Sequence, residues 1–399
     1  MKFPIQYLNS NDGSGILAFG EGERFQMSGK GTLAKLQEFI QLNSNNYIFG
    51  FLSYDLKNDI EDLKSSNTDH SAFPDAFFWV PEVVVILNHE HFKFVQGKQT
   101  PENLEFLNFF IEEETDQNYH HFPFEFKPRT SKEEYLKTVL KLKEEIQRGN
   151  IYEINYCQEF YAENSTIQYP FDAYFKLNQL TKAPFSSFLS IDNHIILCGS
   201  PERFIKREGN KLISQPIKGT AGRGKTELED AALIVALKND SKERAENVMI
   251  VDLVRNDLSK IAEKNSVVVD ELCGIYSFET VHQMISTISC QVKTETRLID
   301  VLRATFPMGS MTGAPKLRAM ELIEESENFK RGIYSGSVGY IEPNGNFDFN
   351  VVIRSLTYNK ENKYLSCAVG SAITIGSDPE KEYEECILKV NRILTGMNE

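Results

Sequence analysis

Two pairs of glutamates have the spacing of neighbours on one face of a helix. Glu243 and Glu246 are three residues apart, and so are Glu382 and Glu385, with Lys389 further along the second stripe. Side chains three or four residues apart on a helix lie close together. Four carboxylates on two facing helices would suit a hard cation held by oxygen ligands and water. A single pair of this kind is more simply a solvent-exposed helix face, so the spacing alone leaves both interpretations open.

One lysine stands where an apolar run meets a glycine. Lys218 follows a predicted apolar strand and precedes Gly219-Thr220, and the glycine would allow a substrate to approach closely. A lysine that is desolvated, or that lies near other cations, has a lowered pKa and attacks as a neutral amine. We therefore expect a nucleophilic lysine with a lowered pKa, with an ordinary surface lysine as the alternative.

An arginine and a tyrosine form a candidate site for a carboxylate. The planar guanidinium of Arg354 matches a carboxylate, and the hydroxyl of Tyr334 would lie beside it. A loop of two or four residues around Asn344-Gly345 would put the two side chains on opposite faces of a hairpin. A three-residue loop, or one bulge, would pair them directly, and we predict one of these two. The alternative is an arginine at a strand edge in a surface ion pair.

The elements that would position these residues are helices and hairpins. Helices are expected over 131–148, over two stretches of 226–257, from Pro315 to before Gly332, and from Asp378 onward. Ser131 and Asp378 are preferred N-cap residues, and a glycine at 149 would end the first helix. Strands are expected over 47–54, 77–87, 91–94 and 194–217, and in three runs over 333–373, with turns at 208–210, 343–346 and 359–362. Strands joined by hairpins form antiparallel sheets, so the predicted class is α+β.

Composition excludes some classes of partner. The 399 residues include 43 Lys and Arg against 57 Asp and Glu, a formal net charge of −14. This balance argues against general binding of nucleic acids or anionic membranes, which requires a basic face. The length suggests two or three domains, or one large core. The polar, acidic stretch 112–121 predicts a boundary between an N-terminal α+β region, residues 1–121, and a catalytic region, residues 122–399.

The cysteines and the hydropathy pattern indicate a cytoplasmic protein. The six cysteines are scattered without a C-x-x-C pair, which excludes a short-spaced zinc site and favours reduced, buried thiols. The N-terminus has no apolar segment of signal-peptide length. The most apolar early stretch, 72–87, is interrupted by Pro74, Asp75, Pro81 and Glu82 and is too short to span a bilayer.

Eight segments resemble, in order, those of the chorismate-utilising enzymes. They are SPERF (200–204), QPIKGTAGRG (215–224), KERAENVMIVDLVRND (242–257), PMGSMTGAPKLRAMELI (307–323), GIYSGSVGY (332–340), VVIRS (351–355), AVGSA (368–372) and DPEKEYEECILKV (378–390). The resemblance covers about residues 130 to 399. It implies a large sandwich of two packed, mainly antiparallel sheets with helices outside, similar to anthranilate synthase component I, in which the two parts of the chain interleave.

Within this family the chain is most similar to the aminodeoxychorismate synthase branch. The Pro-Ile-Lys-Gly-Thr sequence around Lys218 resembles the motif of that branch, whereas anthranilate synthases usually carry Ala at the lysine position. The implied reaction is amination of chorismate at C4 with ammonia, giving 4-amino-4-deoxychorismate on the route to para-aminobenzoate and folate. The alternative that stays open is anthranilate synthase component I, which aminates C2 and eliminates pyruvate.

The resemblance implies catalytic roles for four of the residues. Lys218 would attack C2 of chorismate, and Glu202 in SPERF would protonate the departing C4 hydroxyl. A glutamate that acts as an acid must have its pKa raised by burial; the alternative is an exposed turn carboxylate paired with Arg203. Thr220 and His282 would line the C4 side of the site, with His282 hydrogen-bonded to the departing hydroxyl.

The resemblance also identifies the cation as Mg²⁺. Glu246 and Glu385 would be direct ligands, and Glu243 and Glu382 would bind through water. The metal would hold the ring carboxylate of chorismate, and Arg354 would hold the enolpyruvyl carboxylate. The remaining residues implied in substrate binding are Tyr334, Ser310, Lys389 and, through backbone N–H groups in glycine-containing turns, Gly339, Gly370 and Ser371.

The chain departs from the family pattern at two positions. Gly222 replaces a proline of the glycine-rich loop, which suggests a more flexible loop. Glu153 stands where other aminating members usually have Gln and where isochorismate-forming members have a water-activating Lys; the glutamate itself has no explanation from sequence. The chain also lacks the G-x-C-x-G turn of a glutaminase. We therefore expect ammonia from a separate glutamine amidotransferase subunit, for which free ammonium would substitute.

Overall fold

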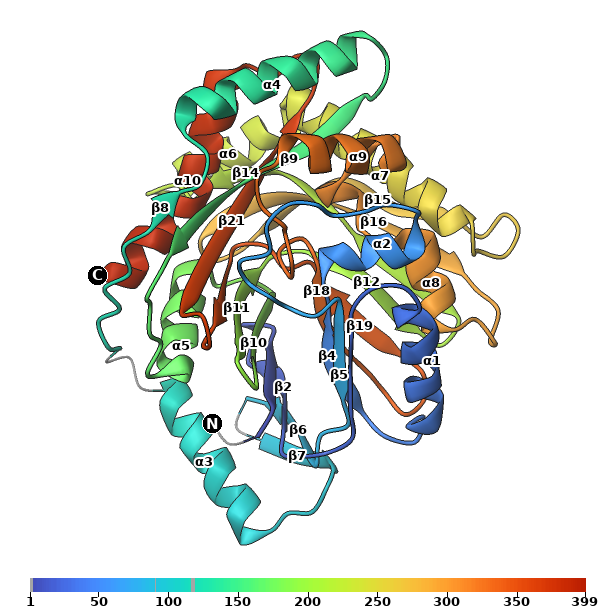
Figure 1. Cartoon of the computed structure of the whole chain (residues 1–399), viewed down its shortest axis with the longest axis vertical. Helices are drawn as coiled ribbons and strands as arrows, with labels where there is room; N and C mark the ends of the chain where they lie inside the picture. The colour runs from blue at the N-terminus through green and yellow to red at the C-terminus, as the bar shows by residue number, and fades with distance from the viewer. Residues whose placement is uncertain (1–2, 90, 116–118) are drawn as a thin grey trace.

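Two large antiparallel sheets form the centre of the structure (Figure 1). The computed structural model describes residues 3–89, 91–115 and 119–399. The eleven-stranded first sheet contains, in spatial order, β17 (Gly313–Ala314), β9 (Glu153–Ala162), β21 (Tyr364–Ile373), β20 (Ser355–Asn359), β11 (His194–Ser200), β10 (Phe185–Ile191), β1 (Ile5–Asn9), β2 (Ser14–Phe19), β6 (Val83–Asn88) and β7 (His91–Gln96), with β8 (Lys127–Pro128) beside β9. The predicted α+β class is confirmed.

The second sheet has ten strands. Their order is β14 (Ile217–Gly222), β16 (Val281–Gln291), β13 (Lys211–Gln215), β12 (Arg203–Glu208), β19 (Phe347–Asn350), β18 (Ser337–Ile341), β4 (Ile48–Leu52), β5 (Ala76–Trp79) and β3 (Arg24–Met27), with β15 (Val268–Ser277) beside β16. Strands formed by residues before 122 therefore complete both sheets. Residues 116–118 of the predicted boundary stretch lie outside the described residues.

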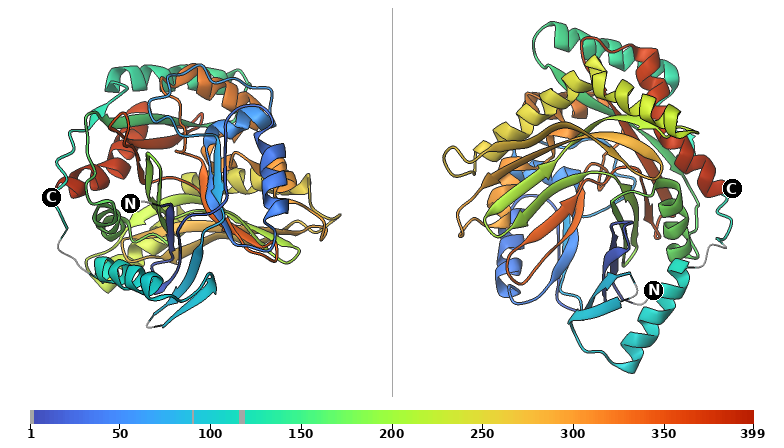
Figure 2. Two further views of the ribbon diagram at one scale, coloured as in Figure 1. Left: turned by 60° about the horizontal axis from the view of Figure 1, so that its bottom comes forward. Right: turned by 180° about the vertical axis from the view of Figure 1, so that it is seen from behind.

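Helices cover the outer face of each sheet (Figure 2). The first sheet carries α3 (Pro101–Thr115), α4 (Lys132–Gln147), α5 (Pro170–Thr181), α9 (Lys316–Ser326) and α10 (Pro379–Asn398). The second sheet carries α1 (Thr32–Leu42), α6 (Glu227–Asn239), α7 (Ser241–Ser259) and α8 (Leu298–Thr305). The short helices are η1 (Tyr54–Leu56), α2 (Lys57–Ile60) and η2 (Gly309–Met311). In the described ranges, no helix has the length and apolar character needed to cross a membrane.

Three apolar layers hold this arrangement together. One layer lies between the first sheet and its helices, and a second lies between the second sheet and its helices. The third lies between the sheets and combines Phe49, Phe51 and Trp79 of the second sheet with Leu189 and Ile196 of the first. Burial of such side chains is the main favourable contribution to folding. All six cysteines are buried without disulfide bonds, as the sequence predicted.

Helix ends follow the capping residues of the sequence. The Ser131 side chain accepts a hydrogen bond from Glu134 N, and the Glu134 side chain binds back, so α4 begins with a capping box. The Asp378 side chain accepts a hydrogen bond from Lys381 N and so caps α10, with a proline as the first helical residue. The helix predicted from Pro315 to before Gly332 is confirmed as α9, which ends at Ser326. The buried Glu327 carboxylate turns inward and accepts a 2.8 Å hydrogen bond from Arg331 Nε.

Two of the segments in which the chain crosses from one sheet to the other lie next to each other. Residues 201–202 join β11 of the first sheet to β12 of the second, and residues 351–354 join β19 of the second to β20 of the first. The crossings are bonded together, since Val351 N donates to Glu202 O at 3.0 Å and Gly199 N donates to Arg354 O at 3.2 Å. Glu202 and Arg354 are thereby placed side by side at the junction of the sheets.

The hairpin of β18 and β19 has the loop that the sequence predicted. Tyr340 pairs with Asp348, and Glu342 N donates to Asn346 O at 2.8 Å, which leaves a three-residue loop at 343–345. Gly345 adopts the left-handed conformation that such loops require, with φ 83°. The predicted odd loop is therefore confirmed, although the strands separate before they reach Tyr334 and Arg354.

Candidate active site

An ion pair joins the two sheets at their ends. Lys218 on β14 places Nζ 3.1 Å from Oε1 of Glu153 on β9. The Lys218 side chain is 12% exposed and the Glu153 side chain only 1%. Glu153, which had no explanation from sequence, is therefore the partner of the candidate nucleophile. Its second oxygen, Oε2, is buried without a hydrogen-bond partner among the described residues.

The expected direction of the Lys218 pKa is wrong for this structure. Burial by itself lowers the pKa of Lys218, but Glu153 and Glu246 outweigh burial, and Glu202 adds to them, so that the pKa lies above its ordinary value. A carboxylate close to an ammonium stabilises the charged form. Lys218 is thus held as an ammonium until its surroundings change.

Replacement of Glu153 by glutamine is expected to lower the pKa of Lys218. Loss of the nearest carboxylate removes the largest contribution that stabilises the ammonium. The pH dependence of Lys218 labelling by an amine-directed reagent, located by peptide mapping, measures the shift. Glu159→Gln is the matched control, because Glu159 is buried on the same strand but pairs with Arg129. An unchanged pKa of Lys218 in Glu153→Gln would contradict this prediction.

Glu202 has the protonation expected of a general acid. Burial raises its pKa to about 7, against the lowering effects of Ser310, Lys218 and Arg354. Ser310 Oγ donates to Glu202 Oε1 at 2.6 Å, which fixes the carboxyl group. Ser310, predicted to bind substrate, thus contacts the candidate acid. The pKa expected from sequence is confirmed, and the exposed-turn alternative is wrong because the glutamate is 4% exposed.

A buried lysine holds the loop that carries Ser310. Lys316 Nζ donates to the carbonyl oxygens of Thr305 and Pro307 at 2.9 and 2.8 Å and pairs with Asp257. The lysine of the GSMTGAPK segment and the aspartate of the LVRND segment therefore meet in space. Their contact gives these two motif residues a structural role, the support of this loop, rather than a chemical role on a substrate.

Arg354 offers a guanidinium with no partner in the described part of the chain. Neither a hydrogen bond nor an ion pair engages it there, and its φ of 51° lies in the left-handed region at the crossing between the sheets. Burial lowers the pKa of Arg354 to about 10, with Arg392 acting in the same direction and Glu202 against it. Strained backbone of this kind often occurs at functional sites. The arginine is available for an anionic ligand.

Tyr334 does not join Arg354. The Tyr334 hydroxyl is hydrogen-bonded with the Cys157 thiol, and burial together with Cys157 raises the pKa of Tyr334 well above its ordinary value. Ser335, with φ 61°, turns the chain before the two residues can pair. The predicted direct pairing of Tyr334 with Arg354 is therefore wrong, even though the loop length was right.

Both ring nitrogens of His282 have hydrogen-bond partners. Nε2 lies 2.9 Å from Asp230 Oδ1 and Nδ1 lies 2.8 Å from Ser277 Oγ, and the side chain is completely buried. In this structure His282 therefore has no ring nitrogen free for a departing hydroxyl. Thr220 lies exposed on β14, where it pairs with Gln283 beside His282.

Carboxylates from α7 and α10 gather beside Lys218. Glu246 is buried, with Oε1 lacking a hydrogen bond, and burial raises its pKa to about 7 against the effect of Lys218. Burial and the nearby Glu385 raise the pKa of Glu243. Across the described ranges, however, no three His, Cys, Asp or Glu side chains lie close enough to hold one metal ion. The four carboxylates are brought together without converging on a point.

The residues around 370 lie in a strand rather than a turn. Gly370 and Ser371 belong to β21 and pair with Cys157 and Tyr156 of β9. A Cβ atom at Gly370 would come within 2.7 Å of Cys157 Sγ, so glycine is required by close packing. Gly339 likewise lies within β18, opposite Phe349. The predicted turn conformation at these three residues is therefore wrong, and the binding of substrate by their backbone N–H groups stays a prediction.

The last two predicted residues are engaged with carboxylates. The Ser371 hydroxyl donates to Glu382. Lys389 Nζ lies 2.6 Å from Glu385 Oε1 and 3.2 Å from the Gly370 carbonyl oxygen. Both residues therefore shape the acidic cluster in this structure, and their contact with a substrate stays a prediction.

Comparison with known proteins places the chain in a family. Residues 5–395 match the family described as chorismate binding enzyme. The chain belongs to this family. It is 36% identical to "Aminodeoxychorismate synthase component 1" of Escherichia coli (strain K12) over 86% of this chain and 75% of that protein. It is 32% identical to the Bacillus subtilis (strain 168) protein of the same name, over 85% and 74%.

A solved structure of the family has the same architecture. Anthranilate synthase component I from Streptococcus pneumoniae TIGR4 superposes with a TM-score of 0.81 and 27% sequence identity, covering 95% of this chain and 92% of that one. The expected sandwich of two packed antiparallel sheets is thereby confirmed.

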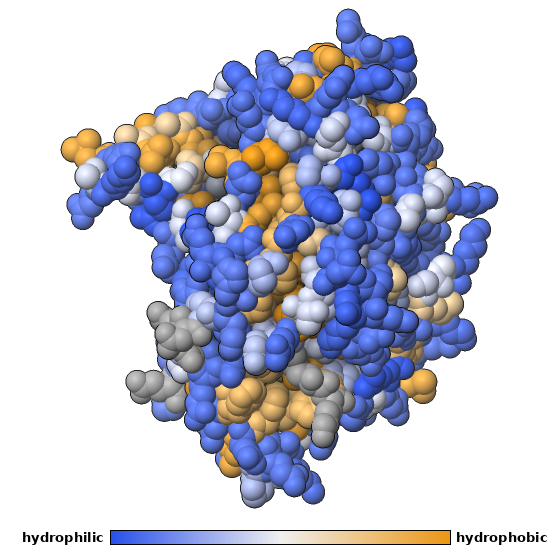
Figure 3. Space-filling view, turned by 60° about the vertical axis from the view of Figure 1, so that its left-hand side comes forward, coloured by the Kyte–Doolittle hydropathy of each residue, from blue (hydrophilic) through white to orange (hydrophobic). Residues whose placement is uncertain are grey.

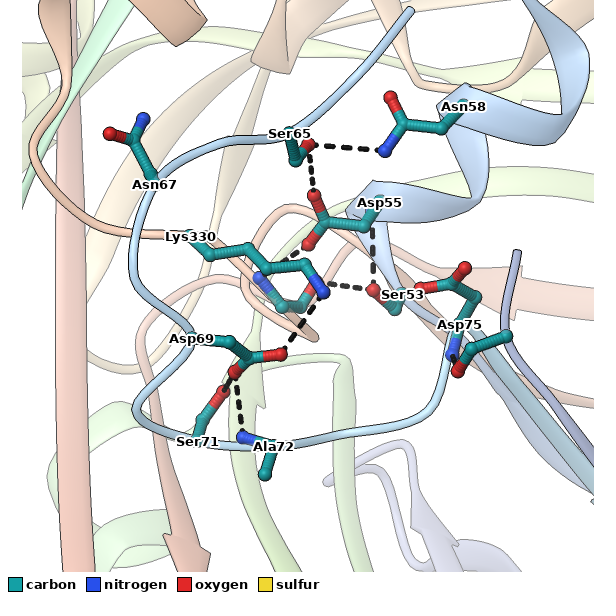
Figure 4. Close-up of polar contacts among 12 residues, drawn as sticks. Ser53, Asp55, Asn58, Ser65, Asn67, Asp69, Ser71, Ala72, Asp75 and Lys330 are labelled. Atoms are coloured by element: carbon teal, nitrogen blue, oxygen red, sulfur yellow. Dashed lines mark hydrogen bonds and ion pairs between the residues drawn. The ribbon is translucent and has the colours of Figure 1, made fainter.

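A second polar cluster fixes the segment before Tyr334 (Figure 4). The buried Asp55 carboxylate accepts hydrogen bonds from Ser65 Oγ at 2.9 Å and from Gly332 N at 3.0 Å. Lys330 Nζ lies 3.0 Å from Asp69 Oδ2. Burial raises the pKa of Asp55 to about 6, although Lys330 and Lys57 act against it. The cluster ties residues 65–69 to residues 330–332, the segment that precedes Tyr334.

One face of the molecule is mainly hydrophilic, with apolar side chains in a projection and in a central band (Figure 3).

Helix α6 carries exposed apolar side chains, since Leu228 is 83% and Val235 57% exposed. The Asp230 side chain of α6 also binds Arg223, Gly224 N and His282, so the helix contacts the glycine-rich loop and the buried histidine. Sequence reasoning missed this contact, because Asp230 belongs to none of the conspicuous segments.

Proposed function

We propose that this protein is component I of an aminodeoxychorismate synthase, which aminates chorismate at C4 with ammonia. The observation that carries the proposal is the grouping of Lys218, Glu202 and Arg354 at the junction of the two sheets. A nucleophile, an acid with a pKa near neutrality and an unengaged anion-binding group lie in one place. The names of the relatives support the same reaction.

Binding would begin with the carboxylates of chorismate. Arg354 would form paired hydrogen bonds with the enolpyruvyl carboxylate, since its guanidinium has no competing partner in the described part of the chain. The negative charge of this carboxylate would offset the two neighbouring arginines, Arg354 and Arg392. This contact orients the ring so that C2 faces Lys218 and C4 faces Glu202.

Displacement at C2 would follow. Lys218 passes one proton to Glu153, and its neutral amine forms a bond to C2 while both ring double bonds shift and the C4–O bond breaks. Glu202 gives its proton to the departing oxygen, which leaves as water. Hydroxide is a poor leaving group, and the raised pKa of Glu202 supplies the acid that it needs.

Ammonia would complete the reaction in a second displacement. It bonds to C4, both double bonds shift back, and the bond from C2 to the Lys218 nitrogen breaks. Glu202 recovers a proton from the new ammonium group, and Glu153 returns its proton to Lys218. The net change is chorismate plus ammonia to 4-amino-4-deoxychorismate plus water.

The acidic cluster fits a magnesium ion bound partly through water. Glu246 has a buried oxygen without a hydrogen bond, and Mg²⁺ commonly uses one or two carboxylates together with water and substrate oxygens. Glu246 and Glu385 would hold the ion, with Glu243 and Glu382 behind water. When bound, the ion would neutralise the ring carboxylate of chorismate amid these negative charges.

Ammonia would come from a separate glutamine amidotransferase subunit. The chain has no G-x-C-x-G nucleophile turn, and its relatives are named as component 1 of their enzymes. Free ammonium at mildly alkaline pH would replace the partner, because it supplies the same nucleophile.

The proposal is tested by identifying the product. Purified protein would be incubated with chorismate, Mg²⁺ and ammonium and analysed by mass spectrometry. A product with the hydroxyl replaced by an amine and the enolpyruvyl group retained is expected. Anthranilate with released pyruvate would instead support the second candidate, anthranilate synthase component I, which the structural neighbour favours.

Replacement of Arg354 by lysine is expected to raise KM for chorismate about tenfold to a hundredfold, with a smaller change in kcat. A hydrogen bond to a charged group contributes about 1.5–3 kcal/mol, and an ammonium cannot reproduce the paired geometry. Steady-state kinetics measure the effect. Arg244→Lys, on the exposed face of α7, is the control. An unchanged KM in Arg354→Lys would remove Arg354 from the binding site.

A further inference from the structure

A lysine bridges the two acidic helices. Lys242, in the first turn of α7, places Nζ 3.1 Å from Glu382 Oε1 and 3.7 Å from Glu246 Oε1. Glu382 belongs to α10 and Glu246 to α7, so the ammonium joins carboxylates of two helices that cover different sheets. The Glu382 and Glu246 side chains are 2% and 9% exposed, whereas the Lys242 side chain is 48% exposed.

The other two lysines near the cluster are paired with other groups. Lys389 lies 2.6 Å from Glu385 and donates to the Gly370 carbonyl oxygen. Lys218 is paired with Glu153. Within the described residues, Lys242 is therefore the cation in ion-pair contact with Glu382 and Glu246. A buried carboxylate without a compensating charge is costly, so this ammonium stabilises both glutamates.

We propose that Lys242 is a resident counter-ion that occupies the cation position of the metal-free protein and is displaced when Mg²⁺ binds. The inference rests on the proposed magnesium site. An ammonium and a divalent cation cannot share the space between the same two carboxylate oxygens, because like charges about 4 Å apart repel strongly. One of them must leave, and the exposed lysine stem leads into solvent.

The anchoring of the carboxylates fixes which group moves. Glu382 is held by the Ser371 hydroxyl, and Glu246 is buried on α7 beside Asn247, which reaches the backbone of β14 and β16. Among the described residues, the Lys242 ammonium makes no hydrogen bond or ion pair besides those with these two carboxylates. Its displacement therefore leaves the glutamates in place, and the ammonium holds the two helices together until the metal arrives. The cost of this arrangement is a weaker affinity for Mg²⁺.

The test compares Mg²⁺ binding by wild type and Lys242→Gln. The glutamine removes the charge and keeps a polar stem. Isothermal titration calorimetry on chorismate-free protein is expected to show Mg²⁺ binding about tenfold tighter in the variant, because competition and repulsion are both lost. Lys242→Arg keeps the charge and should stay within a few-fold of wild type. Lys238→Gln, an exposed lysine of α6, is the matched control.

Thermal unfolding gives a second readout. Without Mg²⁺, Lys242→Gln is expected to unfold at lower temperature than wild type, and Mg²⁺ should raise its midpoint by more. Equal or weaker Mg²⁺ affinity in Lys242→Gln would overturn the inference, as would absence of binding in both proteins. Tight binding by the variant alone would support it. The product assay, run separately, decides the proposed function, so the two failures are distinguishable.

Discussion

Lys218→Ala is expected to reduce C4 amination by about a thousandfold or more, a barrier increase of about 4 kcal/mol. The variant loses the atom that bonds to C2, so the double displacement has no first step. Quantification of 4-amino-4-deoxychorismate with saturating chorismate, Mg²⁺ and ammonium measures the loss. Alanine also leaves Glu153 buried without its cation, so the thermal midpoint must be measured in parallel.

The matched control is Lys211→Ala. Lys211 lies on β13, is 40% exposed and pairs with Asp270 on the surface, so its removal should leave the amination rate within about twofold of wild type. A folded Lys218→Ala protein that still forms aminodeoxychorismate at the wild-type rate would remove Lys218 as nucleophile. A folded variant that forms anthranilate instead would show that the lysine selects the branch.

Glu202→Gln is expected to lower kcat by a factor of about 10² to 10⁴, the usual contribution of a general acid. An acid must be protonated, and the protonated fraction of Glu202 falls as pH rises through its pKa of about 7. Wild type should therefore lose activity on the alkaline side of neutrality. The glutamine has no titrating proton, so the residual rate should lack that limb.

The fold should survive this substitution. Glutamine keeps an oxygen that can accept the hydrogen bond from Ser310 Oγ, and it removes a buried ionisable group. A Glu202→Gln profile with the same alkaline limb as wild type would assign that limb to another group. Full activity of the variant would remove Glu202 from the mechanism.

Local elements were predictable because their signals are local. The capping box at Ser131, the cap at Asp378 and the three-residue loop around Gly345 depend on residues within one turn of each other. The glutamate pairs on α7 and α10 follow from helical spacing. The buried pairing of Glu327 with Arg331 just after α9 carries no such local signal, because it forms in the core.

The site was harder to predict because its electrostatics combine distant segments. The raised pKa of Lys218 depends on Glu153, which lies in the other sheet and 65 positions earlier in the chain. The hydrogen bond that occupies Nε2 of His282 depends on Asp230 of α6. Tyr334 misses Arg354 because the chain crosses between sheets there, and no local pattern marks that crossing.

The covalent step is tested most directly by intact-protein mass spectrometry. Wild type would be mixed with chorismate and Mg²⁺ without ammonium, quenched rapidly, and compared with Lys218→Ala. The account predicts an added mass equal to chorismate less one water, located by peptide mapping to Lys218 and absent from the variant. Wild-type protein that aminates chorismate when ammonium is added, yet carries the adduct on another residue or on none, would contradict it.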